Sequence, residues 1–286
     1  MTNQQFMRRR KIKEKFFRYL AFGLSWFSVI TLIVLLGSVL RDGLHVLKPH
    51  FFTSFPSRFP SKAGILAPIV GSFWIMTLTA VISIPIGVST ALYLEEYAKK
   101  NKLSDLIQVN IATLAGMPSI VYGLLALAVF VRLLKLDHSI LSGALCMSLL
   151  VLPTIIIASQ GAIRAVPHSL REAGYASGAR RYQVVLGQVL PASIPGIMTG
   201  IILAISRAMG ESAPLILLGA LSYVAYLPRS IMDSFTVLPV QIFNWAGRPQ
   251  LEFHQLAAGA IIVLIVFLFA LNLGAVVIRN RYQRYK

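Results

Sequence analysis

Six long apolar runs constrain this chain of 286 residues more than any other feature of its sequence. A helix needs roughly 20 mostly apolar residues to cross a membrane, and each run has about that length. Hydrophobic residues make up 56% of the chain, which excludes an ordinary soluble protein. The pattern predicts an all-α integral membrane protein with six transmembrane helices, at residues 19–40, 69–94, 107–131, 140–160, 193–220 and 256–278.

The basic residues indicate which way these helices run through the membrane. The net charge is +17, and with both termini cytoplasmic 18 of the 27 basic residues lie inside, 8 outside and one within a span. Cytoplasmic loops carry such an excess of Lys and Arg, so we expect cytoplasmic N- and C-termini. Because topology accounts for much of the basicity, we expect contact with membrane lipid and no binding of nucleic acid.

The apolar runs also divide the chain into segments. The first run exceeds the roughly 7–15 residues of a signal-peptide core, so we expect it to stay as a helix. Several prolines follow it and predict irregular structure there. The expected segments are a basic cytoplasmic N-terminus, a first helix with its outer loop, a transmembrane domain and a basic cytoplasmic tail, at residues 1–18, 19–63, 64–279 and 280–286.

Residues that disturb helices occur inside four of the runs. Such residues are tolerated where neighbouring helices or a wet cavity satisfy the freed carbonyls, so they indicate either a substrate pathway or packing kinks. They are Pro85, Gly116-Met117-Pro118, Pro153, and Pro195 with Pro214. Gly196 and Gly200 form a GxxxG pair, which predicts a close helix contact.

One arginine lies inside an apolar run. Arg207 is about half way along 193–220, and Glu211 follows after one helical turn, so in a continuous helix both side chains point the same way. Charges within membrane helices usually face the protein interior or a water-filled path. Two interpretations stay open: a structural ion pair, or an anion pathway in which Arg207 contacts the substrate.

The sequence offers no residue set for catalysis or for a metal. It contains no GxxxxGK[ST] phosphate loop, and its five histidines and single Cys146 show no zinc-type spacing. We therefore expect no enzymatic activity, no metal and no cofactor in this chain. Hydrolysis of ATP would need a separate subunit.

A basic, polar segment at about 161–191 separates the fourth and fifth runs. It contains Glu172-Ala173-Gly174, then Gly178 after three residues, then Leu190-Pro191. This spacing resembles the EAA loop of ABC importer permeases, although Gly174 replaces an alanine and Gln188 replaces an isoleucine of the family pattern. The resemblance implies a cytoplasmic coupling helix that docks on a separate ATPase. The residues carried over to that role are Glu172, Ala173, Gly174, Gly178 and Pro191.

The composition of this segment suits docking, although an ordinary basic loop would carry similar charges. Small residues at helical spacing allow another protein to approach closely. Gly178 permits a turn, and Pro191 suits the first turn of the next helix. The residues on the expected docking face are Leu170, Ala173, Ala176 and Ser177.

Further motifs resemble the PstA family of permease subunits of phosphate ABC importers, closely over about 64–220. They are Gly116-Met117-Pro118-Ser119-Ile120-Val121-Tyr122-Gly123, Leu152-Pro153-Thr154, Arg164-Ala165-Val166-Pro167, Ser169-Leu170-Arg171-Glu172-Ala173, and Arg207-Ala208-Met209-Gly210-Glu211-Ser212-Ala213-Pro214. The resemblance implies the type I ABC importer permease fold in a bacterial inner membrane. It also implies that Arg207 and Glu211 act in phosphate translocation.

The same resemblance implies partners. They are a related phosphate permease of the PstC type in a heterodimer, ATPase subunits of the PstB type and an external phosphate-binding protein of the PstS type. Two alternatives stay open. One is a permease for another oxyanion, such as phosphonate, molybdate or sulfate, and the other is a self-sufficient secondary transporter.

Overall fold

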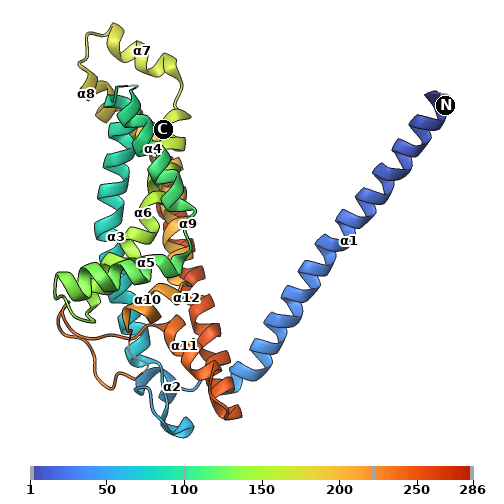
Figure 1. Cartoon of the computed structure of the whole chain (residues 1–286), viewed down its shortest axis with the longest axis vertical. Coiled ribbons are helices and arrows are strands. Elements are labelled where there is room, and N and C mark those ends of the chain that lie inside the picture. The colour runs from blue at the N-terminus through green and yellow to red at the C-terminus, as the bar shows by residue number, and fades with distance from the viewer. Residues whose placement is uncertain (1–2, 100, 221–222, 284–286) are drawn as a thin grey trace.

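The computed structural model describes residues 3–99, 101–220 and 223–283, so the predicted terminal segments 1–18 and 280–286 lie partly outside the described residues. The described chain is a bundle of helices (Figure 1). Five helical stretches are long and apolar enough to cross a membrane, and a bent helix pair brings the number to as many as six. The all-α membrane fold predicted from the apolar runs is confirmed.

The centre of the bundle is built from α3 (Leu66–Leu92), α6 (Ile140–Arg164) and α9 (Leu190–Met209). Helix α3 continues into a π-helical turn, η3 (Tyr93–Tyr97). Helix α9 packs closely on α6, because an ideal Cβ on Gly196 would lie 2.7 Å from the Cβ of Ala162, and one on Gly200 would overlap Ala158. The close contact predicted for the GxxxG pair is therefore confirmed.

Helix α1 (Asn3–Gly43) stands away from the bundle over most of its length (Figure 1). It meets the last helix, α12 (Leu251–Gln283), near its own C-terminal end. There an ideal Cβ on Gly43 would lie only 2.7 Å from the backbone of Ala258, so a glycine is needed for this approach. The apolar surface of α1 is otherwise exposed.

The third predicted span is not one straight helix. Helix α4 (Lys102–Ala115) and helix α5 (Ser119–Ala126), which continues into η4 (Leu127–Leu133), meet at an angle of 103°. Pro118 lacks an amide hydrogen and disfavours helical angles at Met117, so the helix breaks there. As a result α5 lies across the long helices (Figure 1).

The fifth span also differs from the prediction of 193–220. The helix begins earlier, with α8 (Arg181–Val184) and the π-helical η5 (Val185–Val189), and runs without interruption to Met209 at the end of α9. A short helix, α10 (Ala213–Leu218), follows the break. A continuous helix would bring the ring of Pro214 against the carbonyl of Gly210, which explains why α9 ends before it.

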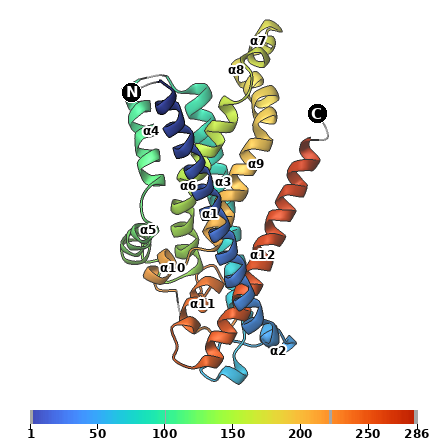
Figure 2. The same cartoon turned by 90° about the vertical axis from the view of Figure 1, so that its right-hand side faces the viewer.

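Two ends of the bundle lie far apart in both views (Figures 1 and 2). One end carries α7 (His168–Ala176). The other carries short helices that follow α1 or precede α12: η1 (Leu44–Val46), α2 (Pro49–Thr53), η2 (Pro60–Lys62) and α11 (Leu238–Ala246). Trp245 of α11 is fully buried there, with its ring centroid 6.2 Å from that of Phe51.

Candidate functional site

A cavity of about 290 Å³ lies where α4 bends into α5, beside α6 and the end of α9. Three of the sequence motifs meet around it, although they are far apart along the chain. The first contributes Gly116 to Ser119, the second contributes Thr154, and the third contributes Arg207 and Glu211. The two helix breaks described above therefore open onto one space.

The position of Arg207 differs from the sequence prediction. Arg207 lies in the last turn of α9 rather than half way along a span, because the helix ends at Met209. Glu211 lies beyond the helix, with its amide N–H donating to the carbonyl of Ala208 at 3.1 Å. Both side chains nevertheless line the same cavity.

The two charges at the cavity are not paired with each other. The described residues contain three ion pairs, and none of them includes Arg207 or Glu211. Arg207 is exposed and Glu211 is partly buried. The geometry therefore gives no support to the structural ion pair that the sequence left open.

Two hydroxyl groups add to the polar lining of the cavity. Ser119 begins α5 and Thr154 follows Pro153 in α6, and neither side chain forms a hydrogen bond within the described chain. Tyr122 differs, since its hydroxyl donates to the carbonyl of Leu114 at 2.7 Å. A hydroxyl both donates and accepts, so the cavity offers a guanidinium, a carboxylate and two uncommitted hydroxyls to one ligand.

A helix, α7, forms within the segment for which the sequence predicted a coupling helix, and it projects at one end of the bundle (Figures 1 and 2). Glu172 and Ala173 lie on its exposed side, while Gly174 is buried. Gly178 has a φ of +81°, a left-handed conformation that favours glycine, so the turn predicted from the sequence is confirmed. The rest of the expected docking face, Leu170, Ala176 and Ser177, is also exposed.

Pro191 lies in the first turn of α9, as predicted, but this helix has no free N-terminus. It continues directly from η5, whose π-helical turn precedes the proline. Pro191 cannot donate the usual helical hydrogen bond, and a single π turn inside a longer helix is the form in which π-helices mostly occur.

The two departures from the EAA pattern contact each other. An ideal Cβ on Gly174 would lie 2.7 Å from the Oε1 atom of Gln188 and 2.9 Å from the Cγ2 atom of Val184. Glycine at 174 therefore makes room for the glutamine that stands in place of the family's isoleucine. The sequence alone identified both substitutions but not their contact.

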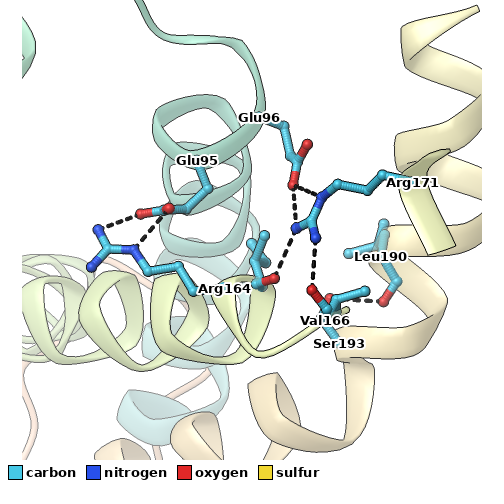
Figure 3. Close-up of polar contacts among 8 residues, drawn as sticks. Glu95, Glu96, Arg164, Val166, Arg171, Leu190 and Ser193 are labelled. Atoms are coloured by element: carbon cyan, nitrogen blue, oxygen red, sulfur yellow. Dashed lines mark hydrogen bonds and ion pairs between the residues drawn. The ribbon is translucent and has the colours of Figure 1, made fainter. Parts of the chain in front are cut away.

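Two glutamates that the sequence did not single out form ion pairs near α7. Glu95 and Glu96 lie in η3 and form ion pairs with Arg164 at 2.6 Å and with Arg171 at 2.8 Å, as Figure 3 shows. A signal was available, because only ten residues of the chain are acidic and these two are adjacent at the end of an apolar run. Their partners, 69 and 75 residues away, were not deducible from the sequence pattern.

The chain is similar in sequence to known membrane subunits of transport systems. The family model described as "binding-protein-dependent transport system inner membrane component" matches residues 83–284. The chain is 32% identical to the probable ABC transporter permease protein YqgI of Bacillus subtilis, over 93% of this chain and 95% of that protein. It is also 32% identical to the phosphate transport system permease protein PstA of Haemophilus influenzae, over 89% of this chain and 90% of that protein.

Solved structures support the fold. The crystal structure of a bacterial ABC transporter that imports alginate matches with a TM-score of 0.66 at 16% identity, over 97% of this chain and 99% of that chain. An inward-facing methionine ABC transporter matches with a TM-score of 0.60 at 19% identity, over 77% of this chain and 94% of that chain. This chain belongs to the family of inner-membrane components of binding-protein-dependent transport systems, the permease subunits of ABC importers.

Proposed function

We propose that this chain is the membrane permease subunit of an ATP-driven ABC importer that carries inorganic phosphate into the cytoplasm. The observation that carries the proposal is the cavity at which Arg207, Glu211, Ser119 and Thr154 meet without protein partners among the described residues. The relatives from Haemophilus influenzae and Yersinia pestis, named as phosphate transport system permeases, support phosphate as the substrate.

The chemistry of the cavity lining fits this substrate. Arg207 supplies a planar fork of donors for phosphate oxygens. Inorganic phosphate is partly protonated near neutral pH, so its P–OH group donates to the carboxylate of Glu211. Sulfate has no such proton, and the same carboxylate repels it, which gives selectivity through an unfavourable alternative. The hydroxyls of Ser119 and Thr154 donate to the remaining oxygens.

The coupling role of α7 is part of the proposal. Glu172, Ala173, Gly174, Gly178 and Pro191 belong to an element that docks on an ATPase, and the exposed face of α7 supports this assignment. The transmembrane domain at 64–279 then pairs with a related permease of the PstC type. ATPases of the PstB type and an external phosphate-binding protein of the PstS type complete the importer.

The proposed orientation has both termini in the cytoplasm of a bacterial cell. In both views α1 begins and α12 ends toward the end of the bundle that carries α7 (Figures 1 and 2). The excess of basic residues at these segments favours the cytoplasmic side. The opposite end, with α2 and α11, then faces the binding protein.

Reconstitution tests the proposal. The chain is placed in vesicles with the related permease, the ATPase and the binding protein, and uptake of radiolabelled phosphate is measured with and without ATP. We expect uptake that requires ATP and that excess sulfate or molybdate does not inhibit. Preference for another oxyanion would contradict the substrate, and ion-driven uptake by this chain alone would contradict the importer itself.

A further inference from the structure

We propose that the buried pair of Glu96 and Arg171 is a positioning contact that transmits movement of the coupling helix α7 to the transmembrane helices. This inference rests on the proposed import function. Arg171 lies on α7, and Glu96 lies in η3 at the end of α3, so the pair joins a docking element directly to a membrane-spanning helix (Figure 3).

Arg171 connects three segments rather than two. Its Nε and Nη2 atoms donate to Oε1 of Glu96 at 3.1 and 2.8 Å. Its Nη1 donates to the carbonyl of Val166 at 2.7 Å, and Nη2 also donates to the carbonyl of Ile163 at 3.0 Å. Ile163 lies in the last turn of α6, where helical N–H partners run out, and Val166 lies just beyond the end of that helix. The guanidinium therefore fixes α3, α6 and α7 relative to one another.

The burial of the pair makes this connection rigid. The side chain of Arg171 is 13% exposed and that of Glu96 is 8% exposed. Separating such a pair leaves a buried charge without a partner, which is strongly unfavourable. The two segments are therefore expected to move together when an ATPase displaces α7.

One face of α7 is attached to the bundle, and the opposite face is exposed and free to dock on an ATPase. Arg171 and Gly174, one helical turn apart, face the bundle, while Glu172 and Ala173 are exposed. The contact of Gly174 with Gln188 is a second attachment, but it leads to η5 and α9 only. Without the Arg171 contact, α7 stays linked to α9 and loses its direct connection to α3.

The neighbouring pair of Glu95 and Arg164 supplies a matched control. Arg164 donates from Nε and Nη2 to the two carboxylate oxygens of Glu95 at 2.8 and 2.6 Å. This pair joins η3 to the end of α6 without touching α7, and the side chain of Arg164 is 57% exposed. The side chain of Glu95 is 13% exposed. Because neither residue lies on α7, loss of this pair should leave the coupling helix in place.

The experiment compares Glu96→Gln, Arg171→Lys and the control Glu95→Gln in reconstituted importers. Phosphate uptake and ATP hydrolysis stimulated by the loaded binding protein are measured in the same vesicles, per assembled complex. We expect uptake per ATP to fall by about fivefold or more in the first two variants, with ATP hydrolysis retained. The Lys variant keeps the charge but cannot hold the carboxylate and both carbonyls in one plane. The control should stay close to wild type.

Two results would overturn the inference. One is unchanged uptake per ATP in both Glu96→Gln and Arg171→Lys. The other is failure of both variants to assemble while Glu95→Gln assembles, because the pair would then be needed only for structure. If the wild-type importer carries a different anion, the same ratio is measured with that anion, so an error in the substrate is separated from an error in the coupling contact.

Discussion

At the end of the bundle that carries α7, Arg164 and Arg171 each pair with a glutamate of η3, whereas Arg207 and Glu211 line one cavity and form no ion pair among the described residues. Both regions place arginines from sequence motifs near carboxylates. They differ in whether protein groups already occupy the hydrogen-bonding capacity of the charged side chains.

This difference separates a positioning role from a substrate-binding role. A buried guanidinium that holds a carboxylate and two carbonyls has little capacity left for a ligand. An arginine at a cavity retains its donors, and a permeating anion can use them. Charges within membrane proteins are costly unless they are paired or face water or a substrate, so the two unpaired charges at the cavity support the proposal that it belongs to the substrate pathway.

The orientation of the chain in the membrane gives the largest expected effect, because an introduced cysteine either reacts with a reagent outside the cell or does not. Cysteines placed at Ser57 and Ser230 should react with a membrane-impermeant thiol reagent in intact cells, and one at Asn101 only after permeabilisation. The native Cys146 is fully buried and should give little background. The reverse pattern would place α7 outside the cell, and the comparison of a coupling end with a transport cavity would fail.

Substitution of Arg207 should give the largest change in transport. Arg207→Gln removes the charge, and hydrogen bonds to charged groups contribute roughly 1.5–3 kcal/mol, so uptake should fall about ten- to a hundredfold. Arg207→Lys keeps the charge without the fork and should give an intermediate loss. Phosphate uptake per assembled complex is the measurement.

A double variant tests whether Arg207 and Glu211, unlike the ion pairs near α7, do more than neutralise each other. If Arg207 and Glu211 formed a structural pair, Arg207→Gln alone would leave Glu211 as a charge without a partner. Neutralising both residues would remove that charge and restore function. We expect Arg207→Gln with Glu211→Gln to stay as inactive as Arg207→Gln alone. Near-normal uptake in the double variant would contradict the pathway role.

The sequence predicted the long helices well, because a membrane span needs an apolar run of fixed length. It failed where an apolar run continues through a break. The run at 193–220 contains both the end of α9 and α10, so hydropathy placed Arg207 in the middle of a helix that in fact ends at Met209. The proline and glycine residues marked the breaks but did not define the angle of 103° between α4 and α5.

The candidate site was predictable in part for a related reason. Arg207 and Glu211 were identified because charged residues are unusual in an apolar run, and the EAA-like segment was identified by the spacing of its residues. Glu95 and Glu96 were missed because their role depends on arginines 69 and 75 residues away. Such pairings arise only when α3, α6 and α7 converge.

Substitution of Gly178 tests whether the turn after α7 is needed for association with the ATPase. Its φ of +81° is unfavourable for other residues by roughly 1–2 kcal/mol, and Asn tolerates this conformation best among them. An added Cβ would meet nothing within 4 Å, so the effect should come from the backbone alone. Gly178→Val should weaken association with the ATPase while membrane insertion persists, and Gly178→Asn should do so much less. Equal, unaltered association in both would contradict the docking assignment.

The contact of Gly174 with Gln188 should give the smallest effect, and it sharpens the comparison by testing an attachment of α7 that involves no charge. Gly174→Ala brings a methyl group against the Gln188 amide, which is flexible, and against Val184, whose branched side chain is stiff. The cost should be about 1 kcal/mol of stability for this overpacking, measured by thermal unfolding of the purified complex.

In a Gln188→Ala background the Gly174→Ala substitution should cost less, by about 0.5 kcal/mol. Equal costs of Gly174→Ala in both backgrounds would show that the two departures from the EAA pattern are independent, and that Val184 alone requires glycine at this position.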